Sequence, residues 1–133
     1  IILSAACTGS TVDSEDGAIE DSAPLGIGDG RRLYGEFCSA CHGPEGQGQP
    51  DWKIPDEKGL RPAPPHDATG HTWHHPDPLL LDIIANGIEF GPSNMPAFRT
   101  TLTEEEQRAV LAFIKTWWEQ GQLEFQHEVT SGG

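Results

Sequence analysis

The motif C-x-x-C-H, formed by Cys38, Cys41 and His42, is the feature that most constrains this chain. Positions three apart lie on one face of a helix, so both sulfurs can reach the two vinyl groups of one porphyrin. The adjacent His42 can then offer a neutral ring nitrogen to the iron. A zinc site is disfavoured because no second C-x-x-C follows, and a thioredoxin-type redox pair because no βαβ pattern surrounds the motif. The motif therefore predicts covalent attachment of one haem c.

The length and charge of the chain restrict its fold and its partners. The 133 residues suffice for one domain of about 100 residues plus a tail. The apolar content of 35% is low for a self-sufficient core, and a buried haem would supply part of the missing apolar surface. The net charge of −13 argues against a nucleic-acid partner and favours redox proteins that dock through a basic patch.

The third cysteine of the chain, Cys7, follows an apolar stub and several small residues. This order is typical of the end of a bacterial lipoprotein signal, so residues 1–7 are expected to end such a signal, with lipid attached to Cys7. An uncleaved membrane anchor and a plain export signal are the alternatives. Each of the three places the domain outside the cytoplasm, on the periplasmic or extracytoplasmic face, where haem c is attached.

Residues 8–28 are predicted to form an acidic, flexible linker. From Thr8 to Asp29 the chain carries six acidic residues, no Lys or Arg, and few large apolar side chains. Such a segment repels itself and buries too little apolar surface to fold. Its expected use is as a tether between the membrane and the haem domain.

A first helix should begin near Asp29 and lead into the haem motif. Leu33 and Phe37 are four residues apart and should face the core. Glycine is costly inside a helix, so one of Gly30 and Gly35 is expected to permit the close approach of another backbone.

Residues 43–76 contain seven prolines and no sustained helical or strand period. This predicts a long loop, which can pack on the haem as its core. Arg61 and an indole N–H of Trp52 or Trp73 are candidate donors to the anionic haem propionates. The histidines of residues 71–75 could bind copper or zinc, but a polar surface loop is the favoured interpretation because no carboxylate or thiol is placed to complete a site.

A short helix is predicted from Asp77, as its N-cap, to Gly87, as its stop. The only methionine of the chain, Met95, follows in a loop rich in Pro and Gly. A thioether is a soft, neutral ligand that can complete the iron opposite His42 and raise its reduction potential. A gap-filling role in the core is the alternative, but the loop position, stiffened by Pro96, favours ligation.

The clearest helix signal is the capping box formed by Thr103 and Glu106. An apolar stripe follows at helical spacing: Val110, Leu111, Phe113, Ile114, Trp117 and Trp118. The haem domain is therefore assigned to residues 29–120. Residues 121–133 are assigned to a polar C-terminal tail that is expected to fray.

Together these motifs resemble class I cytochrome c over roughly residues 28–120. The resemblance implies an all-α fold, in which a small helical domain and a long Pro/Gly-rich loop wrap around one covalent haem. It implies that the first and last helices cross near a glycine and aromatic residues, places that Gly30 and Tyr34 suit. It also implies that a proline carbonyl accepts a hydrogen bond from the proximal histidine, a role open to Pro62 or Pro64.

The function implied by the resemblance is one-electron transfer between redox proteins, not enzymatic turnover. Iron that binds both His42 and Met95 has no open position for a substrate. One role is a mobile or tethered carrier of a respiratory or photosynthetic chain. The other is a fixed haem subunit of a membrane complex, similar to the monohaem lipoprotein cytochrome of alternative complex III. A haem sensor or small catalytic haem protein is a third, weaker possibility. Partners are expected to dock through a small interface near the thioether edge.

Overall fold

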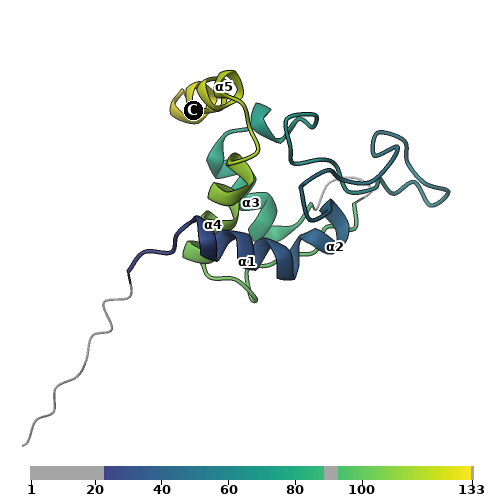
Figure 1. Cartoon of the computed structure of the whole chain (residues 1–133). Helices are drawn as coiled ribbons and strands as arrows, with labels where there is room; N and C mark the ends of the chain where they lie inside the picture. The colour runs from purple at the N-terminus through teal and green to yellow at the C-terminus, as the bar shows by residue number, and fades with distance from the viewer. Residues whose placement is uncertain (1–22, 89–92, 133) are drawn as a thin grey trace, which may run out of the picture.

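The computed structural model describes residues 23–88 and 93–132, so Cys7 and most of the predicted linker lie outside the described residues. Within those ranges the chain contains helices and no strand, which confirms the all-α prediction (Figure 1). The elements are α1 (Ile27–Phe37), α2 (Ser39–His42), the 3₁₀-helix η1 (Thr72–His74), α3 (Asp77–Asn86), α4 (Glu104–Lys115) and α5 (Gln120–Ser131). None of these helices is long and apolar enough to cross a membrane.

Helices α1 and α4 cross at Gly30, and this contact organises the fold (Figure 1). A methyl group on Gly30 would overlap the carbonyl group of Ala109 and lie 3.0 Å from Cβ of Phe113. One helical turn later, the ring of Tyr34 makes edge contacts with Phe113 and Trp117, at centroid distances of 5.6 and 5.0 Å. The predicted crossing of the first helix at a glycine and aromatic residues is therefore confirmed.

The hydrophobic core is built from α1, α3 and α4. Its buried side chains are Leu33, Tyr34, Leu80, Ile84, Leu102, Val110, Leu111, Ile114 and Trp118. Leu80 and Ile84 of α3 lie four residues apart, and Ile114 of α4 lies four residues after Val110, which places each pair on one face of its helix. Leu102 and Trp118 flank α4 and complete the core. The apolar stripe predicted in the last helix is therefore core.

The predicted helix ends agree closely with the structure. The side chain of Thr103 accepts a hydrogen bond from the Glu106 N–H, and the Glu106 carboxylate accepts one from the Thr103 N–H, which confirms the capping box. Helix α3 ends at Gly87, as expected. Its N-cap is Pro76 and not Asp77. Asp77 lies one position further in, where its carboxylate binds side chains from other helices.

The C-terminal segment is helical, so the expectation of a frayed tail after residue 120 is wrong. Helix α5 packs beside η1. Its Gln126 is only 3% exposed and donates to the Asp77 carboxylate at 2.5 Å and to Thr130. The same carboxylate accepts from Lys115 of α4. Polar side chains of α5 thus fasten it to Asp77 of α3, which is also bound by α4, and a search for apolar periodicity does not detect this kind of contact.

The long loop after α2 folds back beneath the haem motif. The Gly48 N–H donates to the His42 carbonyl at 2.7 Å, and the His66 N–H donates to the Gly46 carbonyl at 2.6 Å. Gly46 packs closely on the ring of Trp117, where an added methyl group would come within 2.7 Å of the indole. These contacts bring residues 64–66 against His42, although more than twenty residues separate them in the chain.

Candidate functional site

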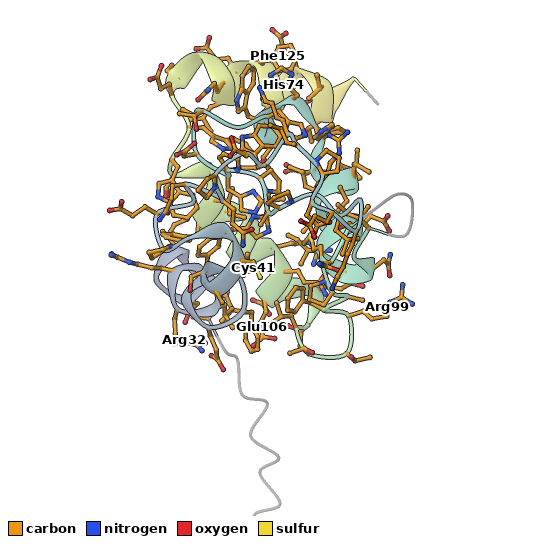
Figure 2. All side chains as sticks on the ribbon, turned by 90° about the vertical axis from the view of Figure 1, so that its right-hand side faces the viewer. Arg32, Cys41, His74, Arg99, Glu106 and Phe125 are labelled. Atoms are coloured by element: carbon orange, nitrogen blue, oxygen red, sulfur yellow. The ribbon has the colours of Figure 1, made fainter. Side chains whose placement is uncertain are left out.

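The two cysteines of the motif lie three residues apart on one helical turn. Cys38 is the C-cap of α1 and the N-cap of α2, and the Cys41 N–H donates back to the Cys38 carbonyl at 3.2 Å. Both are free thiols; Cys38 is half-buried and Cys41 is exposed (Figure 2). Burial raises the pKa of the Cys38 thiol to about 11, and the nearby Cys41 adds to the shift. The turn therefore presents two unpaired thiols together, one of them at the surface.

His42 is held in a single, neutral form. Its ring is 7% exposed, and Nδ1–H donates to the carbonyl oxygen of Pro64 at 2.8 Å. Burial lowers the pKa of His42, so the imidazole is uncharged at neutral pH. With the proton on Nδ1, the lone pair lies on Nε2, the arrangement that a metal-binding histidine requires.

Of the two prolines left open by the sequence, the structure selects Pro64. The carbonyl of Pro64 reaches Nδ1 of His42 because the loop returns beneath α2 through the bonds of Gly46 and Gly48. Pro62, which was expected to take part in cofactor binding, does not accept this hydrogen bond. The choice depends on the path of the loop, which sequence spacing does not specify.

Met95 lies in a short segment fastened to the end of α3. Its N–H donates to the Ser93 hydroxyl at 3.1 Å, and the Phe98 N–H donates to the Ile84 carbonyl at 3.1 Å. A methyl group on Gly87 would come within 2.6 Å of the Met95 carbonyl oxygen, so the two segments pack closely. The Met95 side chain is half-buried against the hydrophobic core. Its ligation of iron stays a prediction.

Several half-buried apolar side chains border the core near these groups. They are Phe37, Cys38, Met95 and Phe98. Phe37 and Phe98 make an edge contact at 6.2 Å. Apolar side chains left half-exposed are suited to be covered by a flat apolar ring. Together with two thiols, a neutral imidazole and a thioether, they form a donor set and a surface that fit a haem c.

The three predicted donors to the haem propionates lie in different surroundings. The indole N–H of Trp73 donates to the Gly70 carbonyl at 3.1 Å, within its own loop. Trp52 stacks on His71, with ring centroids 5.3 Å apart. Arg61 is exposed. The propionate roles of Arg61, Trp52 and Trp73 remain predictions.

Two residues near His42 received no role from the sequence. His66 stacks on the His42 ring, and the indole N–H of Trp118 donates to the His66 carbonyl at 2.8 Å. Only the position of His66 just beyond Pro64 and Pro65 could have signalled this. The stacking itself depends on the tertiary path of the loop.

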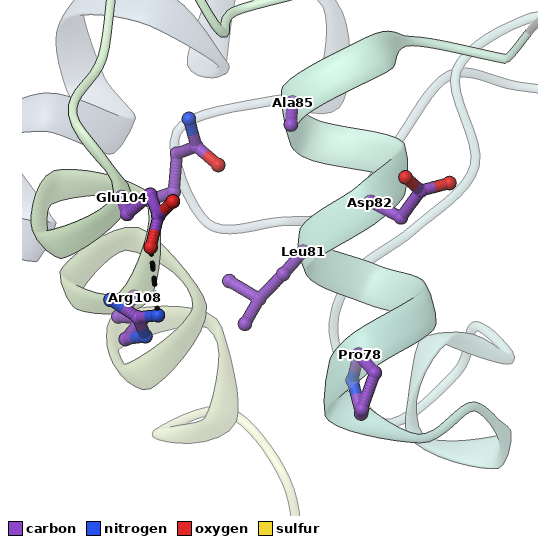
Figure 3. A pocket seen from close by; sticks show the side chains of 7 residues that line it. Pro78, Leu81, Asp82, Ala85, Glu104 and Arg108 are labelled. Carbon is purple, nitrogen blue, oxygen red and sulfur yellow. Dashed lines mark hydrogen bonds and ion pairs between the residues drawn. The ribbon is translucent and has the colours of Figure 1, made fainter.

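The clearest pocket of the described part of the chain lies apart from this site. It has a volume of about 250 Å³ between α3 and α4 (Figure 3). Leu81 points into it, and Glu104 and Arg108 form an ion pair at 3.1 Å along its α4 side. None of the predicted haem-site residues lines it. Among residues 23–88 and 93–132, no group of three or more His, Cys, Asp and Glu side chains is placed to hold a metal ion.

Comparison with known proteins identifies the family. A family model described as cytochrome c oxidase, cbb3-type, subunit III matches residues 26–114. The chain belongs to this family. It contains a monohaem class I c-type cytochrome domain, which confirms the resemblance drawn from the motifs. No curated protein and no solved structure matches the chain.

Family membership establishes the general chemistry of this cytochrome c domain. Haem c, when bound, supplies reversible one-electron oxidation and reduction. The protein's own residues keep the His42 imidazole neutral and leave apolar side chains half-buried at the edge of the core.

Proposed function

We propose that this cytochrome domain carries single electrons with one haem c bound covalently through Cys38 and Cys41. In this proposal, His42 binds the iron through Nε2 and Met95 binds it from the other side. The observation that carries it is the hydrogen bond from Nδ1–H of His42 to Pro64, which directs the lone pair of a buried neutral imidazole away from the protein backbone. Two free thiols in the same helical turn support covalent attachment.

A pair of variants tests the ligands and the attachment. The intact mass of the mature protein should include one haem, and the double variant Cys38→Ala, Cys41→Ala should lose that mass. Met95→Ala should lower the reduction potential and remove the red absorption band of methionine-bound ferric haem, because the soft thioether stabilises ferrous iron. A potential and a ferric spectrum unchanged in Met95→Ala would reject Met95 as the ligand and weaken the carrier function.

We further propose that the domain works outside the cytoplasm, tethered to the membrane through a lipid on Cys7 and the acidic segment 8–28. Support comes from the sequence pattern around Cys7 and from haem c, which is attached outside the cytoplasm. The mass of protein extracted from native membranes tests the tether. Diacylglycerol on a chain that begins at Cys7 would support it, and a chain that retains residues 1–6 would favour a protein anchor.

A fixed subunit of a membrane complex is the second candidate function. The family description, which names a subunit of an oxidase, favours it. Gentle detergent extraction followed by size-exclusion chromatography separates the two roles. Elution of the haem absorbance with a large complex, at moderate salt, would favour the fixed subunit. Elution at the size of the free chain would favour the carrier.

A further inference from the structure

A second imidazole lies flat against the ring of His42. The centroids of the His42 and His66 rings are 3.9 Å apart, and their planes differ by only 22°. His42 is the last residue of α2, and His66 lies in the loop that returns beneath this helix. A parallel ring at van der Waals distance restricts any twist of the His42 plane, because such a twist would drive one ring into the other.

His66 is itself held from several sides. Its Nδ1 lies 3.0 Å from the Thr72 hydroxyl oxygen, and its carbonyl accepts from the Trp118 indole. Its N–H donates to the Gly46 carbonyl, and the edge of Tyr34 covers its ring at 6.3 Å. His66 therefore has little freedom to move.

The other partner of the His42 ring controls a different direction. The hydrogen bond to Pro64 involves a single atom at the ring edge, Nδ1, which lies 2.8 Å from the Pro64 carbonyl oxygen. A hydrogen bond at the ring edge sets the direction in which the ring points, whereas a contact over its face limits rotation of the ring plane. The structure provides both contacts for the same imidazole.

We propose that His66 is a positioning residue, which fixes the orientation of the His42 imidazole plane relative to the haem. This inference rests on the proposed function, since it requires His42 to bind the iron. The plane of an axial imidazole determines how the iron d orbitals split, and groups around a metal ligand tune the metal by orienting that ligand. His66 thereby sets the magnetic anisotropy of the ferric haem.

The test compares ferric holoprotein variants by electron paramagnetic resonance. His66→Leu removes the stacked ring, whereas His66→Phe retains a flat ring against His42. The control, His71→Leu, makes the same change at an exposed histidine of the loop that stacks on Trp52. We expect the largest g value to shift and its line to broaden in His66→Leu. We expect wild-type g values in His66→Phe and in the control, with methionine ligation retained in all three.

Three results would overturn the inference. They are wild-type g values in His66→Leu, a shift in His66→Phe as large as in His66→Leu, and an equal shift in the control. If His66→Leu gives no holoprotein, Thr72→Val decides, because it frees the His66 ring and leaves both histidines in place. Broader lines in Thr72→Val support the inference, and wild-type lines reject it.

Failure of the proposed function is recognised separately in the same experiment. A wild-type ferric protein that lacks the signal of low-spin haem with histidine and methionine ligands would reject the proposed ligand pair. A wild-type protein with that signal, combined with an unchanged His66→Leu spectrum, would reject the positioning role alone.

Discussion

The Cα atom of Gly30 lies against the carbonyl group of Ala109, so that α1 and α4 touch backbone to backbone at their crossing. No other residue type fits at position 30, because a Cβ atom would come within 2.7 Å of the Ala109 carbonyl carbon. Gly35, on the same helix, has no atom within 4 Å of the place where a methyl group would stand.

The first prediction compares these two glycines. Gly30→Ala should lower the free energy of unfolding of the holoprotein by about 1–3 kcal/mol, because the helices must separate to admit the methyl group. Gly35→Ala should leave it unchanged or raise it by up to about 1 kcal/mol, since alanine favours the helix. Denaturation by guanidinium chloride, followed by haem absorbance, measures both. Equal effects of the two substitutions would show that the crossing tolerates a side chain.

The second prediction concerns the attachment of α5. Gln126→Ala should lower the free energy of unfolding by about 1–3 kcal/mol, because it removes the buried amide that binds the Asp77 carboxylate. Gln120→Ala, at an exposed position of the same helix, should change it by less than about 0.5 kcal/mol. Thermal unfolding followed by circular dichroism is a suitable measurement. If Gln126→Ala matches the control, the hydrogen bond between Gln126 and Asp77 contributes nothing to stability.

The third prediction concerns the start of α4. Thr103→Ala removes the hydroxyl that accepts from the Glu106 N–H and should cost about 1 kcal/mol of stability. Thr101→Ala, in the exposed turn just before, serves as the matched control and should have little effect. Chemical denaturation of the two variants in parallel measures the difference. A stable Thr103→Ala variant would mean that tertiary packing alone defines this helix end.

The fourth prediction follows from the net charge of −13. A small cationic oxidant should accept electrons from the reduced protein faster than an anionic oxidant of matched driving force, because attraction raises the encounter rate. The rate advantage of the cationic oxidant should shrink as salt rises, because dissolved ions shorten the Debye length, which is about 10 Å at 0.1 M. Stopped-flow mixing across a salt series measures both rates. A rate for the cation that is independent of salt would argue that the reactive edge is electrically neutral.

The sequence predicted the elements of the fold well because their signals are local. The motif at Cys38, Cys41 and His42, the capping box at Thr103 and the helix stop at Gly87 each depend on residues a few positions apart. Such patterns act through one turn of backbone, so they can be recognised without knowledge of the rest of the chain. Misplacing the start of α3 by one residue, at Asp77, is the usual error of such signals.

The tertiary structure decided every feature that joins distant segments. It chose Gly30 over Gly35 and Pro64 over Pro62, used the Trp73 indole within its own loop, and placed His66 on the face of His42. It also ordered α5 through buried polar contacts. By itself, the sequence determined the haem-binding motif and the signals of α1, α3 and α4, because these depend on residues a few positions apart. The contacts around His42 arise from the path of a loop without periodicity, and only the packing of the whole chain defines that path.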